Sequence, residues 1–252
     1  ITNLSSVYIG DLGKVKLSAN WMANSSDKKE LLNLYQGVER LSKICMKSNI
    51  VIPVGKDSLS MSTKWGNNQS CEVKSPLSLV LSAFASIEDV NNYVTPYTNR
   101  NSQLFLIDLG RGKNRMGGSA LDQTESYINH ESPNINKLDD LLNYFKLSQE
   151  LIRKKLLNAY HDRSDGGLIT TLIEIGFASN MSVDLKNILK KSKTELIEFL
   201  FNEELGGVFA IDKKNEKEFS KLVRKYSLDT ITHKIGTISN EDEPKLKIGS
   251  CN

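Results

Sequence analysis

The sequence predicts an α+β fold made of two parts, and its 252 residues carry two patterns that support this prediction. Apolar residues recur with a period of two in some segments and with helical spacing in others, which indicates strands and helices within one fold. A polar segment at 94–102, which contains Pro96 and lacks periodicity, separates the two parts. We therefore expect one part at 1–93, a linker at 94–102 and a larger part at 103–252.

The composition is that of an ordinary globular protein, with 39% hydrophobic and 25% charged residues. A formal net charge of +3 is far below the concentrated basic field that nucleic-acid binding requires, so we expect no nucleic-acid partner. The longest apolar stretch, 77–87, is about half as long as a bilayer-spanning helix, so we expect no membrane span. The first residue is Ile1 and no signal-peptide pattern follows, which we interpret as a cut inside a longer protein.

The cysteines bear on the compartment and on metal chemistry. Cys45, Cys71 and Cys251 are odd in number and far apart. Such spacing builds neither a disulfide framework nor a CxxC metal site. A reducing, cytoplasmic setting fits best.

The first part is predicted to combine strands with one long helix. Alternating residues at 7–9 and 15–17, next to glycines, indicate strands and a turn. Apolar residues three or four apart over 28–48 indicate a helix that buries one face. The polar segment 66–70 is predicted to be a hairpin loop, and the alternation over 77–87 predicts a strand with one solvated face.

A β-branched run at 50–54 predicts a short buried strand that presents Gly55, Lys56 and Ser58 at its C-terminal end. The segment is not a P-loop, because the upstream glycine and the following helix are missing. A lysine beside glycine and serine can still neutralise a phosphate. The alternative is a strand-end turn with a solvated lysine, and the residues leave both interpretations open.

The second part is predicted to be mixed α and β without an internal repeat. Its apolar patterns predict strands at 104–109, 207–212 and 232–238, helices at 137–156, 168–179, 194–203 and 214–226, and loops at 110–118 and 161–167.

The segment 161–167 reads His-Asp-Arg-Ser-Asp-Gly-Gly and stands at the start of a predicted helix. Backbone N–H groups at a helix N-terminus bind anions, and the oxygens of carboxylates such as Asp162 suit Mg²⁺. The segment therefore indicates a site for a magnesium-bound nucleotide that involves Asp162 and Ser164. The alternative is that Ser164 or Asp165 only caps the helix.

Two glycine-rich segments carry weaker signals. The loop 110–118 mixes three cations with glycines and has two interpretations, a phosphate contact and a mobile surface loop. The segment 202–207, Asn-Glu-Glu-Leu-Gly-Gly, is interpreted as a glycine C-cap that ends a helix before a strand.

Several segments, taken together, resemble phosphoribosylformylglycinamidine synthase in its large, single-chain form. Ser-Ala-Asn-Trp-Met, Pro-Val-Gly-Lys-Asp-Ser and His-Asp-Arg-Ser-Asp-Gly-Gly form a specific combination, and their order and spacing match the family as well. The similarity covers nearly the whole chain, through the segments 2–3, 15–22, 52–61, 75–80, 159–167 and 200–206.

This resemblance implies an activity and a fold. The family is a carbon–nitrogen ligase that uses ATP and ammonia from glutamine to convert formylglycinamide ribonucleotide to formylglycinamidine ribonucleotide in purine biosynthesis. ATP phosphorylates the amide oxygen, and ammonia displaces the phosphate from the iminophosphate. The chain is similar to most of the second half of the synthetase core, which resembles aminoimidazole ribonucleotide synthase. A partial small α+β domain at 1–93 would then precede a larger α/β domain at 103–252.

The resemblance also implies site residues and cofactors, namely Mg²⁺ and ATP or ADP. Asn3 and Asp162 match magnesium ligands of the family, and Ser164 matches a nucleotide contact. A family glutamate that would complete the metal site lies before Ile1. Small-form relatives have Asn where this chain has Lys56, which favours a phosphate contact over metal binding there. No catalytic residue is assigned, and the remaining matches to nucleotide and substrate contacts are Gly55 and Ser58.

The implied partners belong to the same full-length chain: the first half of the synthetase core and a glutaminase domain, neither of which is visible in this sequence. We expect the isolated chain to be inactive, and its substrate to be a small molecule. Two alternatives remain. The first is a non-catalytic half that holds a structural nucleotide, and the second is a related ATP-dependent synthase such as aminoimidazole ribonucleotide synthase.

Overall fold

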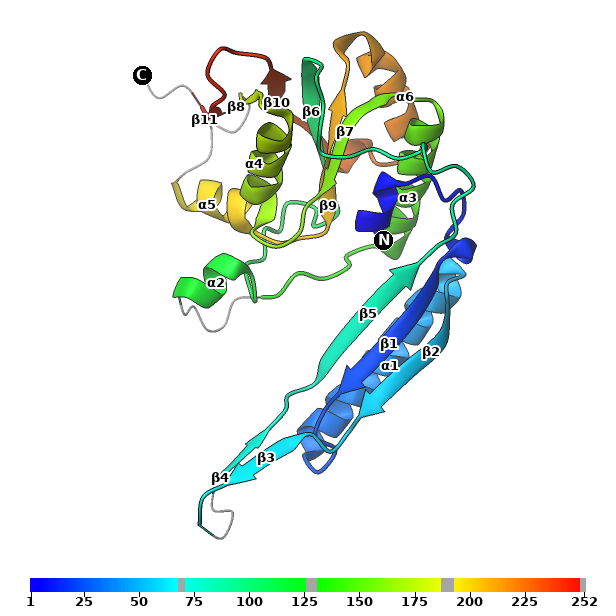
Figure 1. Ribbon diagram of the computed structural model, residues 1–252, viewed down its shortest axis with the longest axis vertical. Helices are drawn as coiled ribbons and strands as arrows, with labels where there is room; N and C mark the ends of the chain where they lie inside the picture. The colour runs from blue at the N-terminus through cyan, green and yellow to red at the C-terminus, as the bar shows by residue number, and fades with distance from the viewer. Residues whose placement is uncertain (68–70, 126–130, 187–192, 250–252) are drawn as a thin grey trace. The chain divides into compact units, whose positions relative to one another are not determined.

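The computed structural model describes residues 1–67, 71–125, 131–186 and 193–249 (Figure 1). The chain divides into two compact units. The first unit comprises Ile1–Tyr8 and Asp89–Asn252, and the second unit comprises Ile9–Glu88. Cys251 and part of the predicted 66–70 loop lie outside the described residues.

The first unit is built on a sheet in which the described residues form six strands, in the order β11-β8-β10-β6-β9-β7. All neighbours in this sheet are antiparallel except β8 and β11, which are parallel. The strands are β6 (Ser102–Asp108), β7 (Leu157–Asp162), β8 (Ser182–Leu185), β9 (Gly206–Ile211), β10 (Thr232–Ser239) and β11 (Leu246–Ile248).

The central strands of this sheet are buried on both faces, which explains their continuous apolar runs. In β6, Leu104 and Leu106 join one hydrophobic cluster, whereas Phe105 and Ile107 join a second cluster on the opposite face. This division follows from the period of two along a strand. β9 divides its side chains between the same two clusters in the same alternating way.

Helices cover both faces of the sheet (Figure 1). α4 (Gly167–Ser179) and α5 (Lys193–Phe201) pack on the first cluster, and α3 (Leu138–Arg153) and α6 (Glu216–Lys225) pack on the second. A short helix, α2 (Ala120–Glu125), follows the glycine-rich loop. The α+β fold class is confirmed by this arrangement. None of the helices in the described ranges is long and apolar enough to cross a membrane.

The second unit contains a three-stranded sheet, a long helix and a hairpin in its described part. The sheet has the order β2-β1-β5, with β1 parallel to β2 and antiparallel to β5. The Asp27 carboxylate caps the helix by accepting the N–H groups of Lys29 and Glu30. The elements are β1 (Lys16–Met22), α1 (Lys28–Ser48), β2 (Val51–Ser58), β3 (Ser62–Trp65), β4 (Cys71–Lys74) and β5 (Ser78–Phe84).

Three expectations for the first 93 residues were wrong. The strand predicted at 7–9 is an isolated bridge from Val7 to Tyr93, because a 3₁₀ turn, η1 (Asn3–Ser6), precedes it. The strand predicted at 50–54 is not buried, since Val54 is 60% exposed on a strand that pairs on one side only. The apolar face of α1 is only partly buried, since Leu31, Tyr35 and Val38 are exposed whereas Cys45 is buried.

Candidate functional site

Asp162 is the last residue of β7, where it faces Gly207 of β9 across the antiparallel pair. Its side chain is 12% exposed. Four residues separate it from the start of α4 at Gly167. The carboxylate therefore stands on a rigid strand end beside a helix N-terminus, a position that suits ligand binding.

The first unit brings Asn3 and Asp162 together. Asn3 begins the turn η1, and its side chain lies close enough to Asp162 to contribute to lowering the pKa of that carboxyl. The neighbouring Thr2 hydroxyl donates to Asp162 Oδ2 over 3.4 Å, although the two residues are 160 positions apart. The two residues that resemblance singled out as metal ligands thus lie near one another.

His161 controls the charge of Asp162. Burial pushes the pKa of Asp162 upward, but the hydrogen bond and charge of His161 outweigh burial and leave this pKa below its ordinary value. The hydrogen bond to Asp162 in turn raises the pKa of His161, against the opposing effect of burial. His161 Nδ1 donates to the Asp162 carbonyl over 2.8 Å and Nε2 donates to Glu174 Oε2 over 2.5 Å. Donating both bonds requires the imidazolium form, which the raised pKa of His161 favours.

The donor set of this site fits Mg²⁺ in part. Asp162 offers carboxylate oxygens and Asn3 an amide oxygen, which are the hard ligands that Mg²⁺ takes alongside water and phosphate oxygens. No cluster of three or more His, Cys, Asp or Glu side chains that could hold a metal occurs among the described residues. The pair could therefore supply only part of a coordination shell, and substrate phosphates and water would have to complete it.

No side chain of the segment 161–167 caps the N-terminus of α4. Its N-cap is Gly166, in the left-handed conformation with φ 81°, and the interpretation of Ser164 or Asp165 as the helix cap is wrong. Both of these side chains are exposed. Gly167 also has a positive φ of 75°, and a Cβ there would lie 2.7 Å from the backbone of Phe201, so only glycine allows this close approach.

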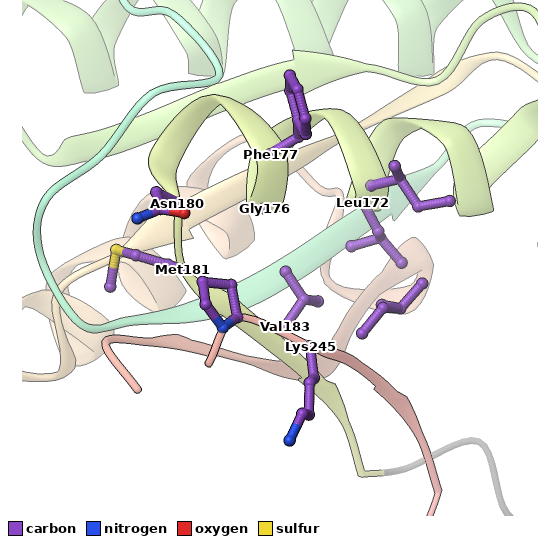
Figure 2. A pocket seen from close by; sticks show the side chains of 10 residues that line it. Leu172, Gly176, Phe177, Asn180, Met181, Val183 and Lys245 are labelled. Carbon is purple, nitrogen blue, oxygen red and sulfur yellow. The ribbon is translucent and has the colours of Figure 1, made fainter. Parts of the chain in front are cut away.

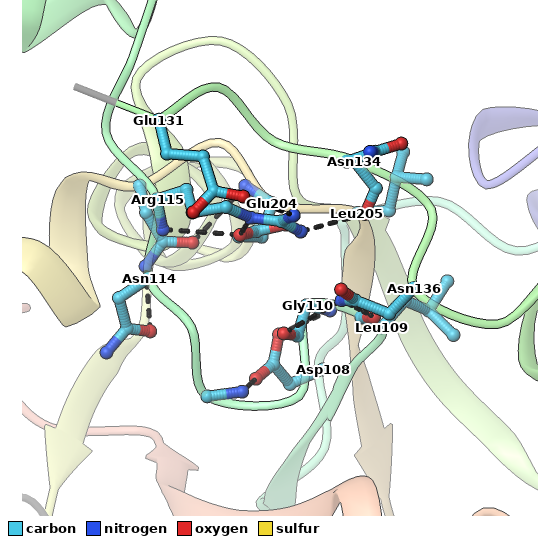
Figure 3. Close-up of polar contacts among 12 residues, drawn as sticks. Asp108, Leu109, Gly110, Asn114, Arg115, Glu131, Asn134, Asn136, Glu204 and Leu205 are labelled. Carbon is cyan, nitrogen blue, oxygen red and sulfur yellow. Dashed lines mark hydrogen bonds and ion pairs between the residues drawn. The ribbon is translucent and has the colours of Figure 1, made fainter. Parts of the chain in front are cut away.

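A buried ion pair between Arg115 and Glu204 holds part of the glycine-rich loop 110–118 (Figure 3). Arg115 Nε and Nη2 donate to the two oxygens of Glu204 over 2.5 and 2.7 Å, and Nη2 also donates to the Asn134 carbonyl. The Asp108 carboxylate accepts the N–H groups of Gly110 and Gly112. Because Arg115 is committed to Glu204, it is not a phosphate contact in this arrangement.

The segment 202–207 joins the two loops, a role that the C-cap interpretation missed. α5 ends at Phe201, well before the glycines. Glu203 Oε1 accepts the N–H groups of Ala120 and Gly166, each over 2.8 Å, which ties the loop before α4 to the start of α2. The two adjacent carboxylates Glu203 and Glu204 were the available sequence signal for this role, but the local sequence does not show which residues they bind.

Arg163 packs against the segment 202–207. Its Nη2 donates to Asp108 Oδ1 over 2.6 Å, and its Nε donates to the Glu204 carbonyl. The side chain is fully buried, and its Nη1 has no hydrogen-bond partner within the described ranges. Arg163 therefore anchors the 161–167 segment rather than facing a ligand.

Gly55, Lys56 and Ser58 belong to the second unit, whereas Asn3, Asp162 and Ser164 belong to the first. Gly55, Lys56 and Ser58 lie within β2, because this strand extends to Ser58. The sequence had indicated that they follow the end of a shorter strand. Lys56 Nζ donates to Ser58 Oγ over 2.7 Å on the same side of the strand. A Cβ at Gly55 would lie 2.6 Å from the Ala19 carbonyl oxygen, which accounts for the glycine.

A groove of about 380 Å³ lies at the opposite end of α4 from Asp162 (Figure 2). It is mainly apolar, and Phe177 on its rim is 87% exposed. Among the side chains that line it, none is a carboxylate or a histidine. The groove is therefore not part of the candidate magnesium site.

Two family models match the chain. The model described as AIR synthase related protein, C-terminal domain, matches residues 109–249. The model described as FGAR-AT PurM_N-like domain matches residues 1–86.

Several solved structures share the fold. HypE from E. coli, a hydrogenase maturation protein, aligns with a TM-score of 0.65 at 14% identity, over 97% of this chain and 74% of HypE. Thiamine-monophosphate kinase from Stenotrophomonas maltophilia K279a aligns with a TM-score of 0.62 at 13% identity, over 97% of this chain and 74% of the kinase. PurL from T. maritima, complexed with ATP, aligns with a TM-score of 0.58 at 12% identity, over 91% of this chain and 35% of PurL. At these identities the likeness establishes the fold alone.

Proposed function

The chain belongs to the PurM-like superfamily through its AIR synthase related C-terminal domain at 109–249, and from this premise we propose that it is part of a phosphoribosylformylglycinamidine synthase. The match of 1–86 to an FGAR-AT PurM_N-like domain supports this choice over the other branches of the fold. In this proposal 1–93 is the latter part of the small domain, 94–102 the linker and 103–252 the large domain. Ile1–Tyr8 nevertheless pack within the first unit, with the residues of the large domain.

The observation that carries the proposal is that the turn with Asn3 is held beside Asp162 by the Thr2 hydroxyl, close to the N-terminus of α4. Phosphoryl transfer depends on positioning and on neutralising charge. In our proposal Asp162 and Asn3 supply oxygen ligands to Mg²⁺, which when bound neutralises phosphate oxygens of ATP. His161 keeps Asp162 ionised and oriented, because it donates to the Asp162 backbone and lies 3.6 Å from Oδ1.

Other residues take supporting roles in this proposal. Ser164 is exposed at the α4 N-terminus, where the helix dipole favours a nucleotide phosphate. On the second unit, exposed Lys56 neutralises a phosphate, with Gly55 and Ser58 beside it. PurL and HypE have each been solved with ATP, which is consistent with a nucleotide here.

The first half of the synthetase core and a glutaminase domain are the proposed partners, and ammonia from glutamine the proposed nitrogen source. The chain spans 35% of the length of T. maritima PurL, so these partners are assigned to the remainder of a longer protein. The free cysteines Cys45 and Cys71 suit a cytoplasmic setting.

The test uses the full-length protein with Asp162→Asn, which keeps the size of the side chain and removes its charge. Formation of formylglycinamidine ribonucleotide from its precursor, ATP and glutamine is measured together with thermal unfolding. Asp229→Asn, an exposed carboxylate of the same unit, is the matched control.

A catalytic site predicts that turnover collapses in Asp162→Asn while the fold persists. A site that holds a structural nucleotide predicts lost thermal stability with little change in turnover at low temperature. If metal content, stability and rate all match the wild type, the metal assignment of Asp162 is wrong.

A further inference from the structure

The turn that carries Asn3 is held in place by a buried tyrosine. Tyr160 Oη donates to the Thr2 carbonyl over 2.6 Å. This carbonyl belongs to the peptide group that joins Thr2 to Asn3, so the bond fixes the plane from which Asn3 departs. The turn η1 has no side-chain cap of its own. Tyr160 therefore supplies an anchor next to Asn3.

A second tyrosine completes a relay of hydroxyl groups. Tyr144 Oη on α3 lies 2.7 Å from Tyr160 Oη, and both side chains are buried. A tyrosine hydroxyl carries a single proton near neutral pH, and a carbonyl oxygen only accepts. Tyr160 gives its proton to Thr2, so Tyr144 must donate to Tyr160. The relay runs in one direction, from Tyr144 through Tyr160 to the carbonyl of Thr2.

Tyr160 and Asp162 are two residues apart on β7, so their side chains project from the same face of the strand. Both reach the same peptide segment: Tyr160 binds the Thr2 carbonyl, and Asp162 accepts the Thr2 hydroxyl. β7 thus carries Asp162 and, through its bonds to Thr2, also holds the turn that carries Asn3. Further along the segment, Gln149 Nε2 donates to the Val7 carbonyl over 3.0 Å and secures its other end.

We infer that Tyr160 is a positioning residue that holds the turn carrying Asn3 beside Asp162, so that Asn3 and Asp162 bind one divalent cation together. This inference rests on the proposed function. Metal ligands must be held within about half an ångström of their working geometry by the groups around them. Groups that orient metal ligands typically contribute 10–100-fold to metal affinity.

The aromatic rings themselves are held by packing. Tyr144 and Tyr160 both meet Phe209 edge to face, with centroid distances of 5.4 and 5.0 Å. Removing one hydroxyl group by substitution with phenylalanine therefore leaves the packing in place. Tyr160→Phe removes the bond to Thr2, whereas Tyr144→Phe removes the hydroxyl pair and leaves the bond to Thr2 intact.

The experiment measures ADP binding to the full-length protein by calorimetry, with Mg²⁺ and with a chelator, for the wild type and both variants. Thermal unfolding of each variant reports on the fold. We expect Tyr160→Phe to lose about 10–100-fold in Mg²⁺-dependent ADP affinity and to keep its affinity in chelator. Tyr144→Phe is expected to remain within about threefold of the wild type in both conditions, even where its melting temperature falls as much as that of Tyr160→Phe.

Equal Mg²⁺-dependent affinity in Tyr160→Phe and the wild type would overturn the inference while leaving the magnesium site itself intact. Equal losses in the two variants, in proportion to their stability, would also overturn it, because the role would then be structural. A wild-type protein whose ADP affinity is indifferent to Mg²⁺ would refute the proposed function, and the inference with it.

Discussion

The buried pair of Arg115 and Glu204 gives the sharpest prediction for stability. The two side chains are only 4% and 1% exposed, and Glu204 accepts two hydrogen bonds from the guanidinium and a third from the Arg115 N–H. The hydrogen bonding of its guanidinium to Glu204 is also the largest cause of the raised pKa of Arg115. Glu204→Gln keeps the size of the side chain and removes its charge, so it leaves a guanidinium buried without its counter-charge.

The remaining carboxylate near Arg115 cannot replace Glu204. Glu131 lies 3.6 Å from Nη1, but its side chain is 72% exposed and its charge is screened by water. Removing one member of a buried ion pair typically costs about 3–5 kcal/mol. At about 2–4 °C per kcal/mol for a domain of this size, the melting temperature should fall by about 6–20 °C.

The assay is urea unfolding of the purified chain, followed by circular dichroism, with Glu131→Gln as the matched control. Because Glu131 forms an exposed pair, its loss should cost no more than about 1 kcal/mol. The double variant Arg115→Met with Glu204→Leu should recover most of the loss, since it removes both buried charges. If the free energy of unfolding of Glu204→Gln lies within about 1 kcal/mol of the wild-type value, the ion pair does not stabilise this loop as we infer.

Three further predictions concern other parts of the chain. Gly167→Ala should destabilise the chain more than Gly112→Ala. Both glycines have a positive φ, where a side chain costs about 1–2 kcal/mol, but only at Gly167 would the added Cβ also lie within 3 Å of backbone atoms; equal losses of unfolding free energy in urea would contradict this. Lys225 donates a hydrogen bond that lowers the pKa of Glu150, so the stability that Glu150 contributes is present above pH 4.5 and is lost as pH falls through the lowered pKa. The difference in unfolding free energy between the wild type and Glu150→Gln should therefore shrink to zero over that range, and a difference that stays constant would refute the assignment. The chain should self-associate through the apolar surface of the second unit, where Phe84 is 60% exposed, and a clean monomer by light scattering at high concentration would contradict this.

The sequence predicted the core of the first unit well, because its strands and helices carry local patterns. The apolar run at 104–107 and the spacing of Leu168, Leu172 and Ile175 were sufficient to locate β6 and α4. The short strands β8 and β11 were missed, since three or four residues carry too little periodicity, and the edge strand β7 was missed as well. Burial in the second unit was overestimated, because amphipathic patterning records which face can be covered and not whether a neighbour covers it.

The candidate site depended on long-range contacts that local patterns do not contain. Asn3 and Asp162 were paired by family resemblance, and the structure adds the bond from Thr2 to Asp162 and the part played by His161. Arg115 and Glu204 are 89 positions apart, so the sequence showed two polar segments but not that one neutralises the other. Tyr160 was part of a recognised motif, yet its bond to Thr2 follows only from the fold.

The central claim is that Asn3 and Asp162 form a magnesium site for a nucleotide. Its most direct test is calorimetric titration of the full-length protein with ADP at a series of Mg²⁺ concentrations, for the wild type and Asp162→Asn. Since changes to groups that merely orient ligands cost about 10–100-fold in metal affinity, loss of a direct ligand should cost at least that much. The account predicts that the Mg²⁺ dependence of ADP binding weakens by this factor in Asp162→Asn while binding in chelator is unchanged. The same Mg²⁺ dependence in both proteins would contradict it.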